Sequence, residues 1–324
     1  MSTATSNLDS SEYLPIHVNT LGACECVDVK LFLQDSETQK LSVYRNGASR
    51  LESGERQWLM EQGDGMLYVA RSDYRGFQHL LRKSLASLLK DDSASVDLRL
   101  ATLSEVARDA IAAAFSSGDV EQVIKQGRAL VHQCAVLLSQ GEYLPAELIA
   151  ALHHDDSPHT HATNTAFLCI LLAKEFGITR LGDLRQIGLG GLLHDLGKRD
   201  VSTHVLTRPE SPTPGDYDQI KRHTHGVYHQ LCHRSDITYG QLMMVYQHHE
   251  RFEGGGYPVG CPAVDVHPWA RICTVIDAFD SLISDRPYRQ RMSLSNAGDI
   301  MKRAREIIFD PEILECWLTT IKHS

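Results

Sequence analysis

Histidines and aspartates are the residues of this chain best suited to chemistry, and the histidines are concentrated in one stretch. Twelve of the 17 histidines lie within residues 153–249. The pair His194-Asp195 follows the apolar run of residues 188–193, and Gly197 and Lys198 come soon after it. Neighbouring side chains on a helix point about 100° apart, so these two cannot share a simple hydrogen bond. They could reach two adjacent metal ions if the carboxylate bridges them. For the pair taken alone, the alternative is a buried histidine that hydrogen-bonds a neighbour.

Further imidazoles and a carboxylate lie inside or at the ends of neighbouring apolar segments. His161 precedes the pair, and His223, the doublet His248-His249 and Asp277 follow it. Neutral imidazoles mixed with carboxylates suit Fe, Mn, Zn or Ni, whereas Ca and Mg prefer oxygen ligands. Helical bundles are a usual scaffold for carboxylate–imidazole dimetal centres. The sequence therefore predicts that rigid helices bring these side chains to one interior metal site.

Three motifs resemble those of one known family. They are HDLGK at residues 194–198, HHERFEGGGYP at residues 248–258 and VIDAFDSLISDRPYR at residues 275–289. In order and spacing they resemble the HD-GYP family of metal-dependent cyclic-dinucleotide phosphodiesterases, over about residues 157–322. The sequence departs from the usual Asp-Gly-x-Gly-Tyr-Pro motif, because Glu253 stands in its first position. The charge is kept and the side chain is one methylene longer, so we expect a shifted loop and a retained activity.

The resemblance implies a set of metal ligands and its division between two divalent ions. The implied ligands are His161, His194, Asp195, His223, His248, His249 and Asp277. Asp195 would bridge the ions, with His161, His194 and Asp277 at one and with His223, His248 and His249 at the other. The cofactors would be two Fe or Mn ions per chain, with Ni, Co or Zn as alternatives.

One position bears on the number of ions. Some members of the family carry a glutamate one helical turn before the first ligand histidine, and this glutamate recruits a third metal. The family pattern places that histidine sixteen residues before the helix-ending glycine, and counting back from Gly177 gives His161 rather than His159. The position one turn earlier is Ser157. A hydroxyl is a poor ligand beside carboxylates, so we expect two metal ions and not three.

Residues around the ligands are expected to bind the substrate or to orient the ligand side chains. Lys198 would bind the substrate and stabilise the charge of the transition state. Asp280, one helical turn beyond Asp277, and Glu250, beside the histidine doublet, would orient ligand side chains.

Other polar residues near these motifs have less defined roles. Arg286 and Arg289 could hold the second phosphate of the substrate or a guanine edge, with surface ion pairing as the alternative. Tyr257 would shape the pocket wall. Three further histidines, His225, His229 and His233, match no family position and are expected to be solvated.

The reaction that the resemblance implies is hydrolysis of cyclic di-GMP to linear pGpG, with further cleavage to GMP left open. Metal coordination lowers the pKa of water from about 15.7 towards 7. A hydroxide activated by two metal ions would attack phosphorus in line with the leaving 3′-oxygen, and Asp195 and Lys198 would be the catalytic residues. Two alternatives are a phosphohydrolase of a related nucleotide and a catalytically weak sensor or interaction protein that binds a cyclic dinucleotide.

Composition restricts the class of protein. The chain has 324 residues, 42% of them hydrophobic, which suffices for the cores of one or two domains. Its formal net charge of −9 argues against a nucleic-acid polymer as partner, since that partner requires a basic face. No run of 18 uncharged apolar residues is present, so the sequence predicts no membrane span. The N-terminus has no basic segment followed by an apolar one, so we expect no secretory signal.

The cysteines favour a reducing compartment. The chain has eight, and Cys24 and Cys26 are the close pair, with a C-x-C spacing and no second pair to complete a zinc site. Cys169 and Cys273 lie in apolar helical runs. We therefore expect reduced thiols and a cytoplasmic protein.

The pattern of the whole chain predicts a mainly α fold, in which an HD-type helical bundle follows a small N-terminal α+β module. Alternating runs at residues 27–34 and 40–45 indicate a hairpin, residues 53–63 a helix and residues 65–71 a third strand. The expected parts are a disordered lead at 1–13, a β-β-α-β module at 14–95, connecting helices at 96–156 and the HD-GYP catalytic domain at 157–324. We expect the module to regulate the enzyme by docking a signalling partner or a second copy of the chain, with ligand sensing as the alternative.

Overall fold

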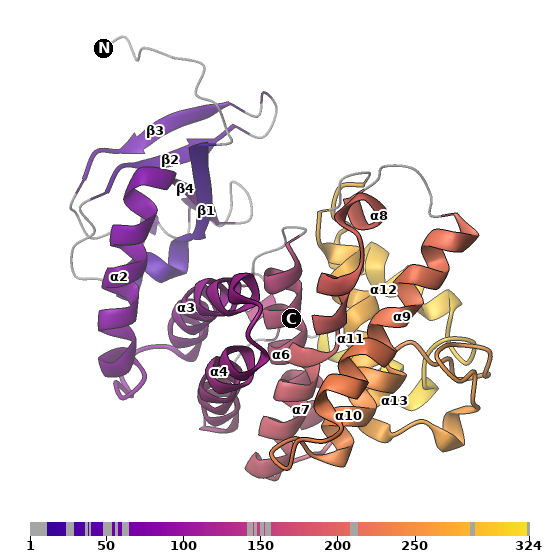
Figure 1. Cartoon of the computed structure of the whole chain (residues 1–324). Helices are drawn as coiled ribbons and strands as arrows, with labels where there is room; N and C mark the ends of the chain where they lie inside the picture. The colour runs from indigo at the N-terminus through magenta and orange to yellow at the C-terminus, as the bar shows by residue number, and fades with distance from the viewer. Residues whose placement is uncertain are drawn as a thin grey trace. The chain divides into compact units, whose positions relative to one another are not determined.

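A computed structural model of the chain describes residues 12–23, 29–35, 38, 40–47, 54–55, 58–59, 65–140, 145, 148–149, 152, 157–207, 213–285 and 289–322 (Figure 1). Within these residues the chain is mainly α-helical and carries one small antiparallel sheet near its N-terminus, which confirms the predicted fold class. The chain divides into two compact units. One holds residues 1–109 and 142–152, and the other holds residues 110–141 and 153–324. The domain bounds expected from the sequence stay a proposal.

The first unit is built on a four-stranded antiparallel sheet with the strand order β1-β4-β2-β3. Its strands are β1 (Tyr13–His17), β2 (Leu31–Gln34), β3 (Leu41–Arg45) and β4 (Met66–Ala70). The β2–β3 hairpin and β4 lie where the alternating runs predict strands. The sequence pattern predicts no strand at β1, where Pro15 lacks the N–H that a ladder uses. This strand lies at an edge of the sheet, the position in which proline is tolerated.

Helix α2 (Arg71–Leu88) packs on the sheet and on the 3₁₀ helix η2 (Val18–Ala23). Phe77, Leu81 and Leu85 follow one another at a spacing of four residues, and all three are buried. This spacing forms the single apolar stripe that a helix needs to cover a sheet. The predicted helix at residues 53–63 and the predicted lead at residues 1–13 fall largely outside the described residues.

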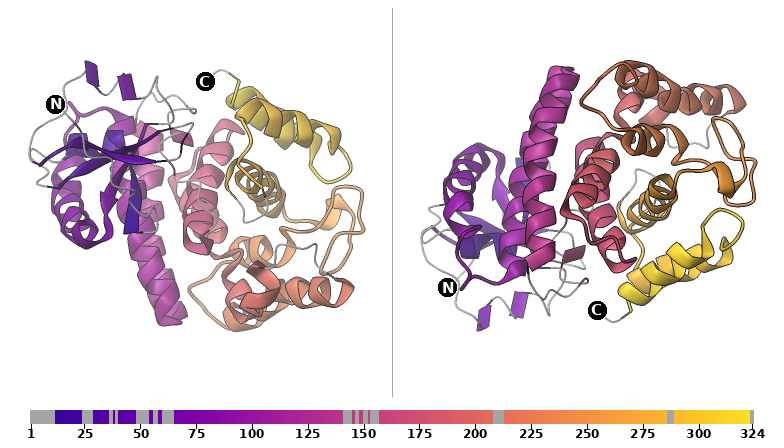
Figure 2. Two further views of the ribbon diagram at one scale, coloured as in Figure 1. Left: turned by 90° about the horizontal axis from the view of Figure 1, so that it is seen from above. Right: turned by 90° about the horizontal axis from the view of Figure 1, so that it is seen from below.

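The second unit is a helical bundle, and the division between the units falls after residue 109, within the range of α3 (Val96–Ser117). Its other elements are α4 (Val120–Gln140), α6 (Pro158–Glu175), α7 (Leu181–Leu193), η3 (Leu196–Asp200), α8 (Thr203–Thr207), α9 (Pro214–Leu231), α10 (Tyr239–Gln247), η4 (Ala263–Asp265), α11 (Pro268–Ile283), α12 (Leu294–Arg303) and α13 (Pro311–Thr320). Helix α11 lies near the centre, and α6, α10, α12 and α13 pack around it (Figure 2). Every residue of α6 from Thr160 to Ala173 is buried, as expected for an interior helix. Among the described residues we find no helix with the length and apolar content that a membrane crossing requires.

Local signals determine where several helices of the bundle begin. A proline occupies the first turn of α6, α9, α11 and α13, and the preceding residue accepts a hydrogen bond from a backbone N–H of that turn. The capping residues are Ser157, Thr213, His267 and Asp310. Proline loses no helical hydrogen bond at this position, and the caps satisfy N–H groups that have no partner inside the helix.

Close packing between η3 and α9 helps to position one candidate ligand helix. Gly197 lies against the backbone of His223, and a Cβ atom added at Gly197 would lie 2.2 Å from the His223 carbonyl oxygen. Backbone atoms cannot move aside as the end of a flexible side chain can. Any side chain at residue 197 would therefore push α9 away from the segment that follows Asp195.

We expect Gly197→Ala to lower the free energy of unfolding by about 1–3 kcal/mol, the usual cost of overpacking. Chemical denaturation monitored by circular dichroism would measure the change. Gly226→Ala is the matched control, because it lies on α9 and a Cβ atom there would meet nothing within 4 Å. Alanine in place of a helical glycine should stabilise the control by about 0.5–1 kcal/mol. Equal stabilities of the two variants would contradict the packing constraint.

Candidate dimetal site

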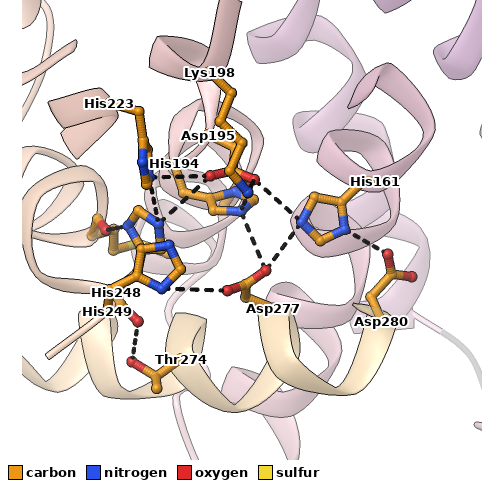
Figure 3. Close-up of polar contacts among 12 residues, drawn as sticks. His161, His194, Asp195, Lys198, His223, His248, His249, Thr274, Asp277 and Asp280 are labelled. Atoms are coloured by element: carbon orange, nitrogen blue, oxygen red, sulfur yellow. Dashed lines mark hydrogen bonds and ion pairs between the residues drawn. The ribbon is translucent and has the colours of Figure 1, made fainter. Parts of the chain in front are cut away.

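All seven side chains predicted as metal ligands converge on one interior site (Figure 3). Helices α6, α9 and α11 each supply one of them, and the ends of α7 and α10 each supply an adjacent pair. In chain order these residues are His161 on α6, His194 and Asp195 at the end of α7, His223 on α9, His248 and His249 at the end of α10, and Asp277 on α11.

The seven side chains form two groups that share one carboxylate. In each group, one ligand atom per residue lies within 4.8 Å of the others. One group is His161, His194, Asp195 and Asp277, and the other is Asp195, His223, His248 and His249. Asp195 belongs to both groups, which is the placement that a bridging carboxylate requires.

The two oxygens of Asp195 face different groups. Its Oδ2 lies 3.4 Å from Nε2 of His194 and 3.6 Å from Nε2 of His161. Its Oδ1 lies 3.3 Å from Nε2 of His223 and 3.7 Å from Nε2 of His248. Two donors that each lie about 2.1 Å from one ion at a tetrahedral angle are separated by about 3.4 Å. The observed separations therefore suit a cation between each oxygen and its histidines.

Several of these ligand atoms are buried without a hydrogen-bond partner in the part of the chain that the structure describes. They are Nε2 of His161, His194 and His249, and Oδ1 of Asp195. Leaving a buried polar atom without a partner costs about 1–3 kcal/mol, and such atoms are normally paired in folded proteins. Imidazole and carboxylate donors together suit divalent transition metals. The residues present therefore fit a metal centre.

Hydrogen bonds at the opposite ring nitrogen orient four of the histidines. Nδ1 of each ring donates to an oxygen, so once the ring is neutral the Nε2 lone pair is available to a metal. The acceptors are Asp280 Oδ2 for His161 (2.7 Å), Gly191 O for His194 (2.7 Å), Ile220 O for His223 (2.6 Å) and Val245 O for His248 (3.0 Å).

The two carboxylates of the site stay ionised although they are buried. Burial alone would raise the pKa of Asp195, but Lys198 and His194 hold this pKa well below its usual range. Against the same effect of burial, His161 and His194 hold the pKa of Asp277 well below its usual range. Burial alone would lower the pKa of both histidines, but the neighbouring carboxylates raise it. The two carboxylates therefore favour positive charge on this side of the site, either as protons on the imidazoles or as a metal ion.

The other three histidines of the site are neutral at pH 7. Burial lowers the pKa of His223 to about 4. Burial also lowers the pKa of His248 and, together with the neighbouring His248, lowers that of His249 well below its usual range. Neutral imidazole is the form that binds a metal, so no proton has to leave these rings at neutral pH.

Residues behind the ligands hold them in place. Asp280 is fully buried on α11, where its carboxylate accepts hydrogen bonds from Nδ1 of His161 and from the Asn164 amide at 2.9 Å. Thr274 donates to the backbone oxygen of His248 at 2.8 Å. Asn164 and Thr274 are not among the functional residues expected from the sequence. Their spacing of three residues from a ligand on the same helix was the signal that could have identified them.

Two predicted substrate contacts lie beside the metal ligands. Lys198 Nζ lies 2.5 Å from Asp195 Oδ2, and the lysine side chain is 31% exposed. The Tyr257 ring packs on His249, with 4.6 Å between ring centroids. Burial raises the pKa of Tyr257, so its hydroxyl stays protonated at neutral pH.

Glu250 holds the glycine-rich loop and not a ligand side chain. The buried carboxylate accepts hydrogen bonds from the backbone N–H groups of Val259 (2.7 Å) and Gly260 (3.0 Å). Its effect on the site is therefore indirect, through the loop that carries Tyr257. Glu253, at the position where the family usually has aspartate, has a half-exposed side chain.

Arg289, which was predicted to bind the substrate, contacts backbone oxygens of the protein instead. The guanidinium of Arg289 donates to the backbone oxygens of Ser281 (2.6 Å) and Leu282 (2.9 Å), so it binds the C-terminal end of α11. Arg286 lies outside the described residues. Contact with substrate stays a prediction for both arginines.

Comparisons with known proteins bear on the family and on the fold. The model of the HD domain family matches residues 147–313. A cyclic di-GMP phosphodiesterase of Pseudomonas aeruginosa is 27% identical over 227 residues, which cover 68% of this chain and 53% of that protein. A cyclic di-GMP phosphodiesterase response regulator of Xanthomonas campestris pv. campestris is 33% identical over 150 residues, 46% of this chain and 39% of that protein. A 3′3′-cGAMP-specific phosphodiesterase of Vibrio cholerae is 33% identical over 145 residues, 44% of this chain and 32% of that protein.

The matches thus span about half the length of the first relative, and less of the other two. A solved structure, an HDG"Y"P protein from Bdellovibrio bacteriovorus, shares the fold with a TM-score of 0.67 at 19% identity. That match covers 96% of this chain and 99% of that chain. The family model covers more than half of the chain, and the HD and GYP motifs lie together at one centre. The chain therefore belongs to the HD domain family, in its HD-GYP branch.

Proposed function

We propose that this chain is a metal-dependent phosphodiesterase that hydrolyses cyclic di-GMP to linear pGpG. The observation that carries the proposal is the position of Asp195, whose two oxygens face two separate groups of metal-binding side chains. Paired metal ions commonly serve the hydrolysis of phosphate esters. The names of several relatives, which are cyclic di-GMP phosphodiesterases, support the substrate.

The proposed cofactors are two Fe or Mn ions, which the mixed imidazole and carboxylate ligands suit. Bound at this site, they would lower the pKa of a water molecule and withdraw charge from the phosphate oxygens. Asp195 would hold the two ions at a fixed spacing. The carboxylates of Asp195 and Asp277 would offset only part of the metal charge, so the pocket would attract a phosphodiester anion. This local charge would let a chain with a formal net charge of −9 bind a nucleotide.

Lys198 and Tyr257 are the proposed contacts to the substrate. The partly exposed Lys198 lies against Asp195 and would place its ammonium group near a non-bridging phosphate oxygen, where negative charge develops during the reaction. The Tyr257 hydroxyl, which burial keeps protonated, would donate a hydrogen bond from the wall beside His249.

A second candidate substrate is 3′3′-cGAMP. Relatives specific for it match this chain at 33% and 31% identity, as well as the cyclic di-GMP phosphodiesterases do. A weakly active sensor of the nucleotide is the alternative from another class. The presence of all seven ligand side chains favours turnover over this alternative.

We also propose a cytoplasmic location. The described cysteines, Cys134, Cys169, Cys232, Cys261, Cys273 and Cys316, are free thiols, which supports a reducing compartment. Cys24 and Cys26 lie outside the described residues. For the first unit, we propose that it regulates the enzyme by docking a signalling partner or a second copy of the chain.

The experiment that tests the proposal is product chromatography with Asp195→Asn. The variant keeps the shape of the side chain but removes the charge that would join two ions. It should lose most bound metal and more than nine-tenths of the turnover of cyclic di-GMP, with its circular dichroism unchanged. Asp218→Asn, an exposed change on α9, is the control and should keep both properties. Turnover by Asp195→Asn above a tenth of the normal rate would exclude the bridging role, and no turnover by the metal-loaded natural chain would favour the sensor.

Metal stoichiometry gives an independent test. The Ser157 hydroxyl caps α6 by accepting a hydrogen bond from the Thr160 N–H at 3.3 Å, and it is a poor metal ligand beside carboxylates. Elemental analysis of anaerobically purified protein should therefore give about two ions per chain. Ser157→Glu, which adds a carboxylate one turn before His161, is the variant that could raise the number. Three equivalents of Fe or Mn, the metals proposed for this centre, would refute the dimetal assignment.

Asp280→Ala should weaken metal binding while Asp195 and the other ligands stay in place. The change removes the acceptor that orients His161, and loss of such a partner typically lowers metal affinity by about 10- to 100-fold. Competition with a chelator would measure the affinity. Asp299→Ala, an exposed change on α12, should leave it unaltered. If both variants hold their metals equally well, Asp280 does not orient a ligand.

A further inference from the structure

Helix α9 carries histidines on two opposite faces. His223 is buried in the candidate dimetal site, whereas His225 and His229 are exposed. At about 100° per residue, positions 223 and 225 point about 200° apart around the helix axis. The two exposed histidines therefore face away from the dimetal site, and neither belongs to its two ligand groups.

The exposed histidines are close enough to act together. They lie four residues apart, so both side chains project from the same face of α9. Their ring centroids are 6.5 Å apart, with 38° between the ring planes. Two histidines one helical turn apart on one face supply two of the ligands in helical zinc motifs.

Aromatic neighbours limit the movement of both rings. Tyr246, on α10, places its hydroxyl 3.5 Å from Nε2 of His225, and the two ring centroids are 5.2 Å apart. Tyr228 packs on Tyr246 at 4.8 Å and on His229 at 5.9 Å between centroids. Restricting the rotamers in advance lowers the entropy that the side chains lose when they hold an ion.

The chemistry of the two donors selects the kind of ion. Imidazole nitrogen suits Zn²⁺, Ni²⁺ and Cu²⁺, whereas Mg²⁺ and Ca²⁺ take oxygen ligands. We propose that His225 and His229 form a two-histidine surface site for a borderline divalent ion, separate from the dimetal site. An ion held there would link consecutive turns of α9, the helix that supplies His223 to the dimetal site.

Retention on a resin of immobilised Ni²⁺–iminodiacetate tests the proposal with the full-length, untagged chain. His194, His223 and His248 are buried, so they cannot reach an ion fixed to a resin. The natural chain should be retained and should elute at a defined imidazole concentration. His225→Gln and His229→Gln should each elute earlier, because losing one of two linked donors should weaken binding by about 100-fold. His233→Gln is the matched control, since His233 is exposed and lies just past the end of α9.

Equal retention of the natural chain and both single variants would overturn the proposal, and so would an equally large effect of His233→Gln. Equilibrium dialysis against Zn²⁺ gives a second readout, because Zn²⁺ also suits the ligands of the dimetal site and should fill both sites. The natural chain should bind about three equivalents of Zn²⁺, and His225→Gln and His229→Gln about two. A loss of more than one equivalent by either variant would place its effect at the dimetal site and would also overturn the proposal.

Discussion

The arrangement of the second unit depends on two ionised carboxylates, Asp195 and Asp277, that are buried in its interior. A buried carboxylate is costly unless positive charge or hydrogen-bond donors compensate it. Asp195 is 8% exposed, and Lys198 and His194 hold its pKa well below the usual range against the effect of burial. The same negative charge that favours protons on neighbouring imidazoles favours divalent cations, so metal ions and protons compete for these rings. This requirement for positive charge accounts for the imidazoles that surround both carboxylates.

The residues that compensate the buried charge lie far apart in the sequence. Their helices must therefore pack at closely defined positions. His161 and Asp280 are separated by 119 residues, yet their side chains hydrogen-bond at 2.7 Å. Helices α6 and α11 must therefore pack directly, and a helix that began one residue earlier or later would turn its ligand by about 100°. The caps Ser157 and His267, each followed by proline, fix the start of these two helices. Local capping signals and the geometry of the site thus depend on each other.

Local sequence patterns predict the helical class of the fold and the metal ligands of the site. The ligand side chains lie in short motifs at the ends of apolar segments, and the helical class follows from apolar periodicity. Strand β1 was not predicted, and its place at a sheet edge, where Pro15 is tolerated, is a property of the tertiary fold. Asn164 and Thr274 were missed because their partners lie on other helices. Arg289 shows a further limit, since its spacing could not reveal that backbone oxygens at the end of α11 accept its hydrogen bonds.

Burial, and not residue type, separates the histidines of α9. His223 and His225 are two residues apart and have the same side chain. Burial lowers the pKa of His223 to about 4 and leaves its Nε2 beside the Asp195 carboxylate, whereas His225 lies exposed on the opposite face. Residue type does not distinguish these two histidines, and in the sequence it is the family pattern that points to His223 alone. Their different chemistry arises when α9 packs against η3 and α10, because this packing decides which face of the helix meets the carboxylate and which meets water.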